Sequence, residues 1–279
     1  MLNSIITDPI IKAALREDLP YIDISSDLLF ENSHKSTAQL ISKDEGILCG
    51  IEIFARTFNL IDDAVRCDIR MTDRDKFSKG DIICEINGPT KSILKAERVA
   101  LNFLSHLTAI ATKTANYCEI VRNTSTKIAD TRKTIPGLRA LQKYAVITGG
   151  GVNHRYNLSD TVMLKDNHIA AYGSIEKAMI AARTKIGHTT KIEVEVKNLN
   201  EVNQALACEA DIIMLDNFTP ELAKQAVDII CGKAIVEASG NITKENLLEY
   251  AKTGVDIISI GGLTHSLTVA DFSLLVDVD

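Results

Sequence analysis

The second half of the sequence repeats one pattern, in which a short apolar, β-branched run ends in polar residues and is followed by a segment with helical periodicity. Six such runs occur, at residues 127–131, 161–165, 191–196, 211–216, 234–239 and 256–261. Strands that alternate with helices and are apolar on both faces predict a parallel sheet covered by helices, either closed into a barrel or left open. Because no G-x-G-x-x-G motif follows the first run, the dinucleotide-binding version loses support. We expect an irregular, incomplete α/β barrel.

Helix start signals separate these runs. Thr219 followed by Pro220 is the clearest, because a side-chain oxygen and a proline at the first helical position suit a first turn whose N–H groups lack partners. Asn198 has capping-box spacing, and Ser174 and Thr243 also precede periodic segments. Strand and helix are therefore expected to alternate throughout this half.

The first hundred residues follow a different pattern and predict a separate domain. We expect a helix near 8–16, short strands around 38–43, 47–51 and 81–86, a turn at 87–89, and a long helix after Leu94. The expected division is an N-terminal domain at 1–112, a barrel at 113–266, and a tail at 267–279 that packs back on the first domain.

Composition excludes several classes of protein. A net charge of -6 and a pI near 5.6 argue against a general binder of nucleic acid or anionic membranes, so an anionic ligand must meet a local basic cluster. No long apolar run suggests a membrane span, and the start reads as a charged helix instead of a signal peptide. The six cysteines are scattered without a CxxC pair, which predicts reduced thiols and no zinc site. We expect a cytoplasmic protein.

Basic residues gather where the first two runs end, and strand ends are where barrels build their sites. Arg132 and Lys133 follow the first run, His154 and Arg155 come soon afterwards, and Lys165 and His168 close the second. Arginine pairs bidentately with carboxylates, whereas lysine acts as a compact charge suited to pyrophosphate. The set predicts a ligand with several negative charges, although any one of these residues alone would more often be a surface ion pair.

The remaining runs end in acidic or small residues. Glu195 and Asp216 suit ribose hydroxyls and a hydrated magnesium ion, and the alternative is that they only neutralise the lysines. Glu193 alternates with Glu195, and its direction stays open. The last two runs end in small residues that let backbone N–H groups approach a phosphate, or that simply form tight turns: Ser239, Gly240, Gly261 and Gly262.

Several strings resemble the quinolinate phosphoribosyltransferases over nearly the whole chain. They are AERVALNFLSHLTAIAT, ADTRKTIPGLRALQKYAV, GGGVNHRYNLSDTVMLKDNHI, IEVEV, IIMLDNF, EASGNIT and GVDIISIGGLTHS, in the family's order. The resemblance implies an open-faced α/β sandwich domain followed by an irregular α/β barrel. It also implies a homodimer, or a higher even oligomer, in which one subunit's first domain meets the other's barrel mouth.

The resemblance also implies roles for individual residues. Arg98, from the partner subunit, would bind the two carboxylates of quinolinate together with Arg132 and Arg155, with His154 beside them. Lys133 and Lys165 would face the pyrophosphate of phosphoribosyl pyrophosphate. Glu195 and Asp216 would hold ribose hydroxyls and Mg²⁺, and the 5′-phosphate would lie against Ser239, Gly240, Gly261 and Gly262. Neither nucleic acid nor a membrane is expected as a partner.

Two positions depart from the family pattern. Asn241 stands where a second glycine usually follows ASG, and Asn157 where a glycine commonly follows HRx. Asparagine tolerates positive φ better than most residues, so the local backbone geometry can survive.

Rival interpretations differ in their chemistry. The paralogous family encoded with molybdate transporters shares the TRK region, but VNHR and LKDNH favour the quinolinate branch. Lys165 at a strand end would also suit the Schiff-base lysine of a barrel aldolase. A non-catalytic sensor of the same ligands, and a nicotinate phosphoribosyltransferase that performs no decarboxylation, complete the alternatives.

Overall fold

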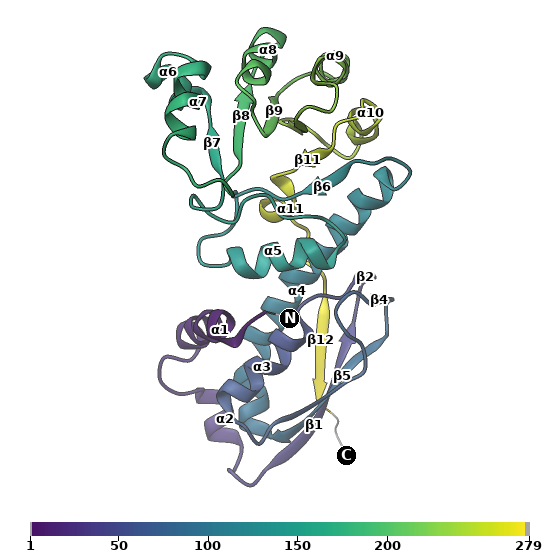
Figure 1. Ribbon diagram of the computed structural model, residues 1–279. Coiled ribbons are helices and arrows are strands. Elements are labelled where there is room, and N and C mark those ends of the chain that lie inside the picture. The colour runs from purple at the N-terminus through teal and green to yellow at the C-terminus, as the bar shows by residue number, and fades with distance from the viewer. Residues whose placement is uncertain (1, 277–279) are drawn as a thin grey trace. The chain divides into compact units, whose positions relative to one another are not determined.

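The computed structural model describes residues 2–276 and divides the chain into two compact units (Figure 1). Within the described residues, the first unit contains 2–115, 134–150 and 263–276, and the second contains 116–133 and 151–262. This division differs from the expected one, because 134–150 cluster with the first unit and not with the strands of the barrel. Residues 277–279 of the expected tail lie outside the described residues.

The first unit is a mixed α/β domain. Its four-stranded antiparallel sheet has the order β12-β1-β5-β3, with bounds Phe272–Val276, Lys35–Ser42, Ile82–Pro89 and Arg66–Ile69. A two-stranded sheet joins β2 (Gly46–Ile47) to β4 (Lys76–Phe77). The helices of this unit are α1 (Ser4–Asp18), α2 (Ile24–Leu29), α3 (Ile51–Ile61), α5 (Arg139–Thr148), α11 (Gly262–His265) and the start of α4 (Thr90–Val121).

The core of this unit lies between the four-stranded sheet and helices α3 and α4. Strand β1 contributes Ala38 and Leu40, α3 contributes Phe54 and Phe58, and all four side chains are fully buried. Figure 1 shows these helices on one side of the strands, as the expected open-faced sandwich requires.

Two local expectations for this unit are wrong. The run 47–51 was predicted to be a strand, but strand β2 ends at Ile47 and α3 begins at Ile51. Gly50 turns the chain with φ +96°, and Asp73 accepts hydrogen bonds from the N–H groups of Gly50 and Ile51 at 2.8 and 3.0 Å. Residues 87–89 were predicted to turn, but they remain in β5 and pair with β1.

The second unit contains a six-stranded parallel sheet in the order β6-β11-β10-β9-β8-β7. The bounds in that order are Lys127–Ala129, Ile257–Ser259, Ile235–Ser239, Ile212–Asp216, Ile192–Val196 and Val162–Leu164. All six predicted strands are confirmed. Because β6 and β7 form the two ends of this order, the barrel is incomplete, as expected.

Helices alternate with these strands (Figure 1). They are α6 (Asp166–Tyr172), α7 (Ile175–Arg183), α8 (Leu199–Ala207), α9 (Pro220–Ile230) and α10 (Leu247–Lys252). Ser174, Asn198 and Thr219 cap α7, α8 and α9 with their side chains, which confirms three predicted starts. The fourth is wrong, because α10 begins at Leu247 and Thr243 precedes it by a turn.

Residues 2–276 include no helix with the length and apolar character needed to cross a membrane.

Candidate active site

A pocket of about 390 Å³ opens in the second unit at the carboxyl ends of the parallel strands. Its lining consists of Thr131, Arg132, Lys133, His154, Arg155, Met163, Lys165, Glu195, Met214, Asp216, Ser239 and Ser259. These residues come from stretches that are far apart in sequence. The parallel sheet brings them to one edge, as the strand-end pattern predicts.

The register of the sheet explains why polar groups meet there. Asp216 on β9 pairs with Ser239 on β10, and Ser239 pairs with Ser259 on β11. On the other side, Glu195 on β8 pairs with Met214 on β9. Since side chains alternate between the two faces of a strand, residues in register share a face. A row of polar strand ends therefore faces one pocket.

Arg132 and Arg155 give the pocket two guanidinium groups. The guanidinium of Arg155 donates from Nη1 to the carbonyl oxygen of Thr161 at 3.0 Å, which fixes its direction. Burial, and then the positive charge of Arg132, lower the pKa of Arg155. Two cationic groups that disfavour each other in a half-buried site are stabilised by a bound anion.

Lys165 and Glu195 form an ion pair at the ends of β7 and β8. Glu195 is largely buried, whereas the Lys165 side chain keeps about half of its surface exposed. Lys133 is exposed at the rim of the same pocket. The site therefore offers ammonium groups to an anion while carboxylates lie directly beside them.

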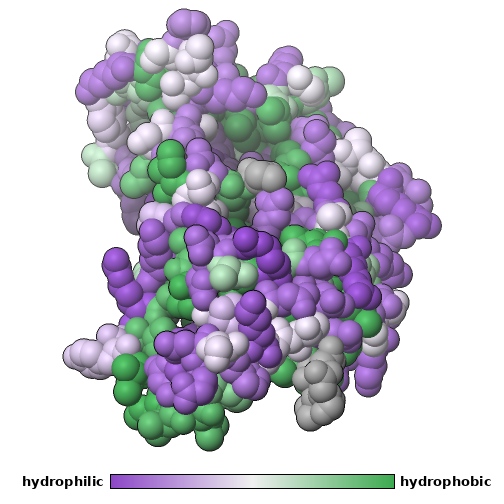
Figure 2. Space-filling model, turned by 90° about the horizontal axis from the view of Figure 1, so that it is seen from below, coloured by the Kyte–Doolittle hydropathy of each residue, from purple (hydrophilic) through white to green (hydrophobic). Residues whose placement is uncertain are grey.

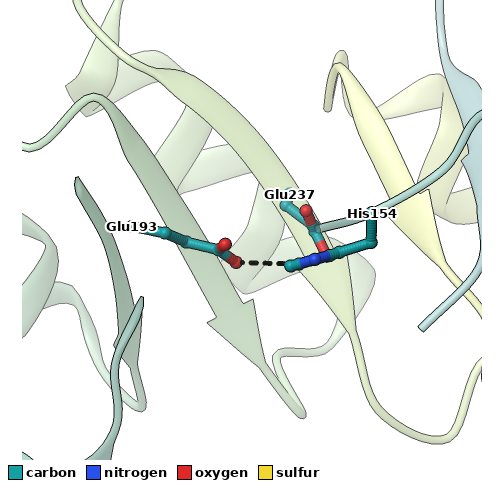
Figure 3. A group of neighbouring side chains, drawn as sticks. All are labelled: His154, Glu193 and Glu237. Atoms are coloured by element: carbon teal, nitrogen blue, oxygen red, sulfur yellow. Dashed lines mark hydrogen bonds and ion pairs between the residues drawn. The ribbon is translucent and has the colours of Figure 1, made fainter. Parts of the chain in front are cut away.

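Deeper in the sheet, Glu193 and Glu237 point toward the imidazole of His154 (Figure 3). The Nε2 atom of His154 lies 3.3 Å from Oε1 of Glu193 and 3.5 Å from Oε1 of Glu237. The Nδ1 atom accepts a hydrogen bond from the Arg155 N–H at 2.7 Å. In this geometry both ring nitrogens of His154 face groups of the protein.

The turn after β10 contains two consecutive residues in the left-handed region, Gly240 and Asn241. Gly240 has φ +96°, and a Cβ there would collide with the Asn217 side chain. Asn241 follows with φ +53°, so the left-handed conformation at this departure from the family pattern is confirmed. Its Nδ2 donates to Oδ1 of Asn217 at 3.0 Å. Asn157, by contrast, is not among the described residues with positive φ.

The pocket includes most of the predicted site residues but not all. Arg132, Lys133, His154, Arg155, Lys165, Glu195, Asp216 and Ser239 line it, whereas Gly240, Gly261 and Gly262 follow β10 and β11 without being part of the lining. His168 is exposed and accepts from the Lys165 N–H at 3.1 Å. Arg98 is exposed on α4 in the first unit.

Four residues of the lining were not among the predicted site residues: Thr131, Met163, Met214 and Ser259. Ser259 carried a signal, because it ends the sixth strand as Ser239 ends the fifth. The two methionines carried none, since an apolar residue inside a strand is normally part of the core.

Glu195 and Asp216 are the pocket residues whose chemistry fits a magnesium ion. They end neighbouring strands, and magnesium takes one or two protein carboxylates and completes its shell with water and phosphate oxygens. Lys165 pairs with Glu195, and Arg132, Lys133 and Arg155 line the same pocket.

Fold and pocket together define an α/β-barrel enzyme that handles a small ligand carrying several negative charges. Residues 23–108 match the model of the quinolinate phosphoribosyl transferase N-terminal domain, and residues 110–275 match that of the C-terminal domain. The chain belongs to the quinolinate phosphoribosyltransferase family.

Individual relatives agree over nearly their full length. A probable carboxylating nicotinate-nucleotide pyrophosphorylase of Bacillus subtilis is 42% identical over 258 residues, which are 92% of this chain and 89% of the relative. The crystal structure of NadC from Streptococcus pyogenes is 43% identical with a TM-score of 0.95, covering 98% of this chain and 97% of that one. The nicotinate-nucleotide pyrophosphorylase from Francisella tularensis is 41% identical, also with a TM-score of 0.95, over 99% and 98% of the two chains.

Proposed function

We propose that this protein transfers the phosphoribosyl group of phosphoribosyl pyrophosphate to quinolinate and decarboxylates the product, which gives nicotinate mononucleotide, pyrophosphate and CO₂. The observation that carries the proposal is one pocket in which two guanidinium groups and two ammonium groups face two carboxylates. A dicarboxylate and a sugar pyrophosphate are ligands whose charges suit that arrangement.

The two arginines are our candidates for binding the quinolinate carboxylates. Arg132 and Arg155 provide planar donor pairs, and the lowered pKa of Arg155 marks a site that an anion would stabilise. His154 would then orient the Arg155 backbone, because its Nδ1 atom accepts from the Arg155 N–H. The ring nitrogen of quinolinate must point toward the ribose carbon that it attacks.

The two lysines are our candidates for stabilising the leaving pyrophosphate. As the glycosidic C–O bond breaks, its electron pair passes to the pyrophosphate oxygen, and the ribose carbon gains oxocarbenium character. Losing one donor aimed at developing negative charge typically costs about 3–4 kcal/mol of transition-state stabilisation. Lys165 lies beside Glu195, so a carboxylate that can bind a ribose hydroxyl adjoins an ammonium that can contact the leaving group.

Magnesium belongs to the proposal, with Glu195 and Asp216 as the residues that would hold it. When bound, it would neutralise charge on the pyrophosphate. The 5′-phosphate would lie against Ser239 and the turn around Gly240, with Gly261 and Gly262 contributing backbone N–H groups.

Decarboxylation requires no prosthetic group. Once the ring nitrogen is alkylated, its positive charge stabilises the electron pair that remains on the ring carbon when CO₂ departs, and a proton from water then binds that carbon. The arginines must not hold the departing carboxylate too tightly, because ground-state binding that is lost in the transition state slows the step.

The proposal includes a homodimer that shares its sites. Exposed apolar side chains gather on α1, α2 and the segment between them, with Tyr21 92% exposed, Leu28 80% and Ile5 79%. Figure 2 shows apolar side chains at the surface of the face turned toward the viewer. Large exposed apolar patches usually mark an interface. Arg98 would reach the partner's pocket from α4.

We also propose that the protein works in the cytoplasm, because all six cysteines are free thiols. The proposed activity is tested by incubating the purified protein with phosphoribosyl pyrophosphate, Mg²⁺ and either quinolinate or nicotinate. The proposal predicts that nicotinate mononucleotide forms in the reaction with quinolinate and not in the reaction with nicotinate. If it forms with nicotinate and not with quinolinate, the proposal is wrong.

A further inference from the structure

Two glutamates and a histidine, Glu193, Glu237 and His154, form a cluster of neighbouring side chains (Figure 3). Glu193 on β8 is 1% exposed and Glu237 on β10 is 4% exposed. Each lies two residues before a strand-end residue that lines the pocket, Glu195 and Ser239 respectively. A role that relies on exchange with solvent or direct contact with substrate does not suit groups buried so deeply.

The hydrogen bond to Nδ1 of His154 decides where the imidazole carries its proton. Because Nδ1 accepts from the Arg155 N–H at 2.7 Å, the ring proton must be on Nε2. That one N–H faces Oε1 of Glu193 at 3.3 Å and Oε1 of Glu237 at 3.5 Å. Among the described residues, Oε1 of Glu237 has no hydrogen-bond partner.

One donor cannot compensate two buried carboxylates. The facing atoms of the three side chains lie within 4.8 Å of one another. A third acid, the fully buried Asp130, accepts from the His154 N–H at 2.9 Å and adds its negative charge to the same region. The hydroxyl of Ser259 faces Glu237 from β11, and Arg155 acts on Glu193 from the other side. Burying this much negative charge around a neutral ring is costly unless one acid is protonated.

Glu237 is the acid best placed to keep a proton. Burial, and then the charge of Glu193, raise the pKa of Glu237 to about 7. When Glu237 is protonated, Glu193 and Glu237 no longer repel each other as two anions, because Glu237 becomes a hydrogen-bond donor and Glu193 stays an acceptor. The proton can then be on Oε1 of Glu237, the oxygen that has no partner among the described residues.

We propose that Glu237 is a positioning residue that carries its proton at neutral pH and, together with Glu193, holds the imidazole of His154 in the orientation that fixes the Arg155 backbone. The positioning role rests on the proposed function, in which Arg155 binds the dicarboxylate. The proton on Glu237 does not rest on it. A metal ion bound in this cluster would need the lone pair of Nε2 of His154 as a ligand. Because Nε2 carries the ring proton, that lone pair is not available.

The first test measures unfolding by urea at pH values from about 5 to 8, for the parent protein and Glu237→Gln. A raised pKa contributes stability that is present below the unfolded-state value and is lost as the pH rises to the folded-state value. As the pH rises through this range, the parent's equilibrium constant for unfolding should therefore increase by a factor on the order of 50 times larger than the factor for Glu237→Gln. Glu176→Gln, at an exposed position on α7, is the control and should keep the parent's pH dependence.

The second test compares kinetic constants for quinolinate. Glu237→Ala should lower kcat/KM by about 10-fold or more, because a small misplacement of a substrate-positioning group can cost up to about 100-fold. Glu237→Gln keeps the shape of the side chain and a hydrogen-bond donor, so it should keep most of the parent's kcat/KM. Because glutamine does not titrate, the pH profile of kcat/KM should be flatter near neutrality than the parent's. A purely structural role would not distinguish the two variants in this way once both are folded.

The two tests fail separately. If parent and Glu237→Gln lose stability in parallel with pH, or if Glu237→Gln loses as much activity as Glu237→Ala, the proposal is wrong. A stoichiometric metal ion in the purified protein that Glu237→Gln removes would also overturn it. If the pH difference in stability is found but no nicotinate mononucleotide forms, the proposed function fails and the proton on Glu237 stands.

Discussion

The ammonium of Lys165 contacts the carboxylate of Glu195 across the ends of the neighbouring strands β7 and β8. Lys165→Ala should remove a charge aimed at the leaving pyrophosphate and leave Glu195 without its partner. We expect kcat to fall by about 100- to 1,000-fold, the usual loss for one preorganised donor. Steady-state kinetics with varied phosphoribosyl pyrophosphate provide the measurement.

Lys224→Ala is the matched control for this prediction. Lys224 pairs with Asp228 at 2.7 Å on the surface of α9, and both side chains are more than half exposed. Exposed pairs contribute about 0–1 kcal/mol, so kcat should change little. Equal losses in the two variants would contradict the assignment of Lys165.

Arg132→Ala and Arg155→Ala should each lose most turnover with quinolinate while the fold survives. The reason is that each removes a planar donor pair that matches a carboxylate. Losing charge-assisted hydrogen bonds of this kind should cost at least about 2–3 kcal/mol in kcat/KM, or roughly 30- to 150-fold. Circular dichroism and urea unfolding verify the fold, and near-parental kinetics would refute the assignment.

Arg183→Ala serves as the comparison for the arginine variants. Arg183 binds Asp211 and the carbonyl oxygen of Glu209, outside the residues that line the pocket. Its loss should affect stability slightly and kcat/KM hardly at all.

The strands of the second unit could be predicted because each is a local apolar run, and their shared direction places their polar ends together. The turn at Gly50 could not be predicted in this way. The N–H groups at the start of α3 donate to Asp73, which is more than twenty residues away in sequence. Likewise, 87–89 form a turn-like string, but pairing with β1 keeps them extended. Glu237 was missed as part of the site because its partners, His154 and Glu193, come from other elements.

Asn241 should tolerate glycine better than a β-branched residue. Its φ of +53° lies in the left-handed region, where a side chain other than asparagine costs roughly 1–2 kcal/mol. Asn241→Val should lower the free energy of unfolding by about that amount and raise KM for phosphoribosyl pyrophosphate. Asn241→Gly should stay within about 1 kcal/mol, because it loses only the bond to Asn217.

For Asn241, equal destabilisation by valine and glycine would contradict this account of the turn. Asn157→Val is the control, because Asn157 is not among the described residues with positive φ. Valine there should cost only the hydrogen bond that Oδ1 of Asn157 accepts from the Ser159 N–H at 2.7 Å, about 1 kcal/mol.

The shared site predicts complementation between impaired variants. If Arg98 acts in the partner's pocket, Arg98→Ala and Arg132→Ala should each lose most of their activity, but a mixed dimer has one pocket with both arginines intact. Mixing after mild dissociation should therefore recover up to about a quarter of the parental activity, since half of the dimers are mixed and each has one working site of two. No recovery, in mixtures shown to exchange subunits, would place Arg98 and Arg132 in the same subunit's site.

Removal of magnesium should separate activity from stability. Chelation should abolish turnover, and added Mg²⁺ should restore it. The midpoint of urea unfolding should not change on chelation, because Glu195 and Asp216 would hold the ion at the pocket and not in the core. Full activity in metal-free buffer would contradict the proposed role of these two carboxylates.

The most direct test of the central claim follows the fate of the carboxylate next to the ring nitrogen. Purified protein is mixed with phosphoribosyl pyrophosphate, Mg²⁺ and quinolinate labelled in its 2-carboxylate, and labelled CO₂ and nicotinate mononucleotide are measured together. The account predicts one CO₂ for each nucleotide formed, and at least about 30-fold slower formation of both products with Arg132→Ala. Tight binding of both substrates without release of CO₂ or pyrophosphate would contradict it.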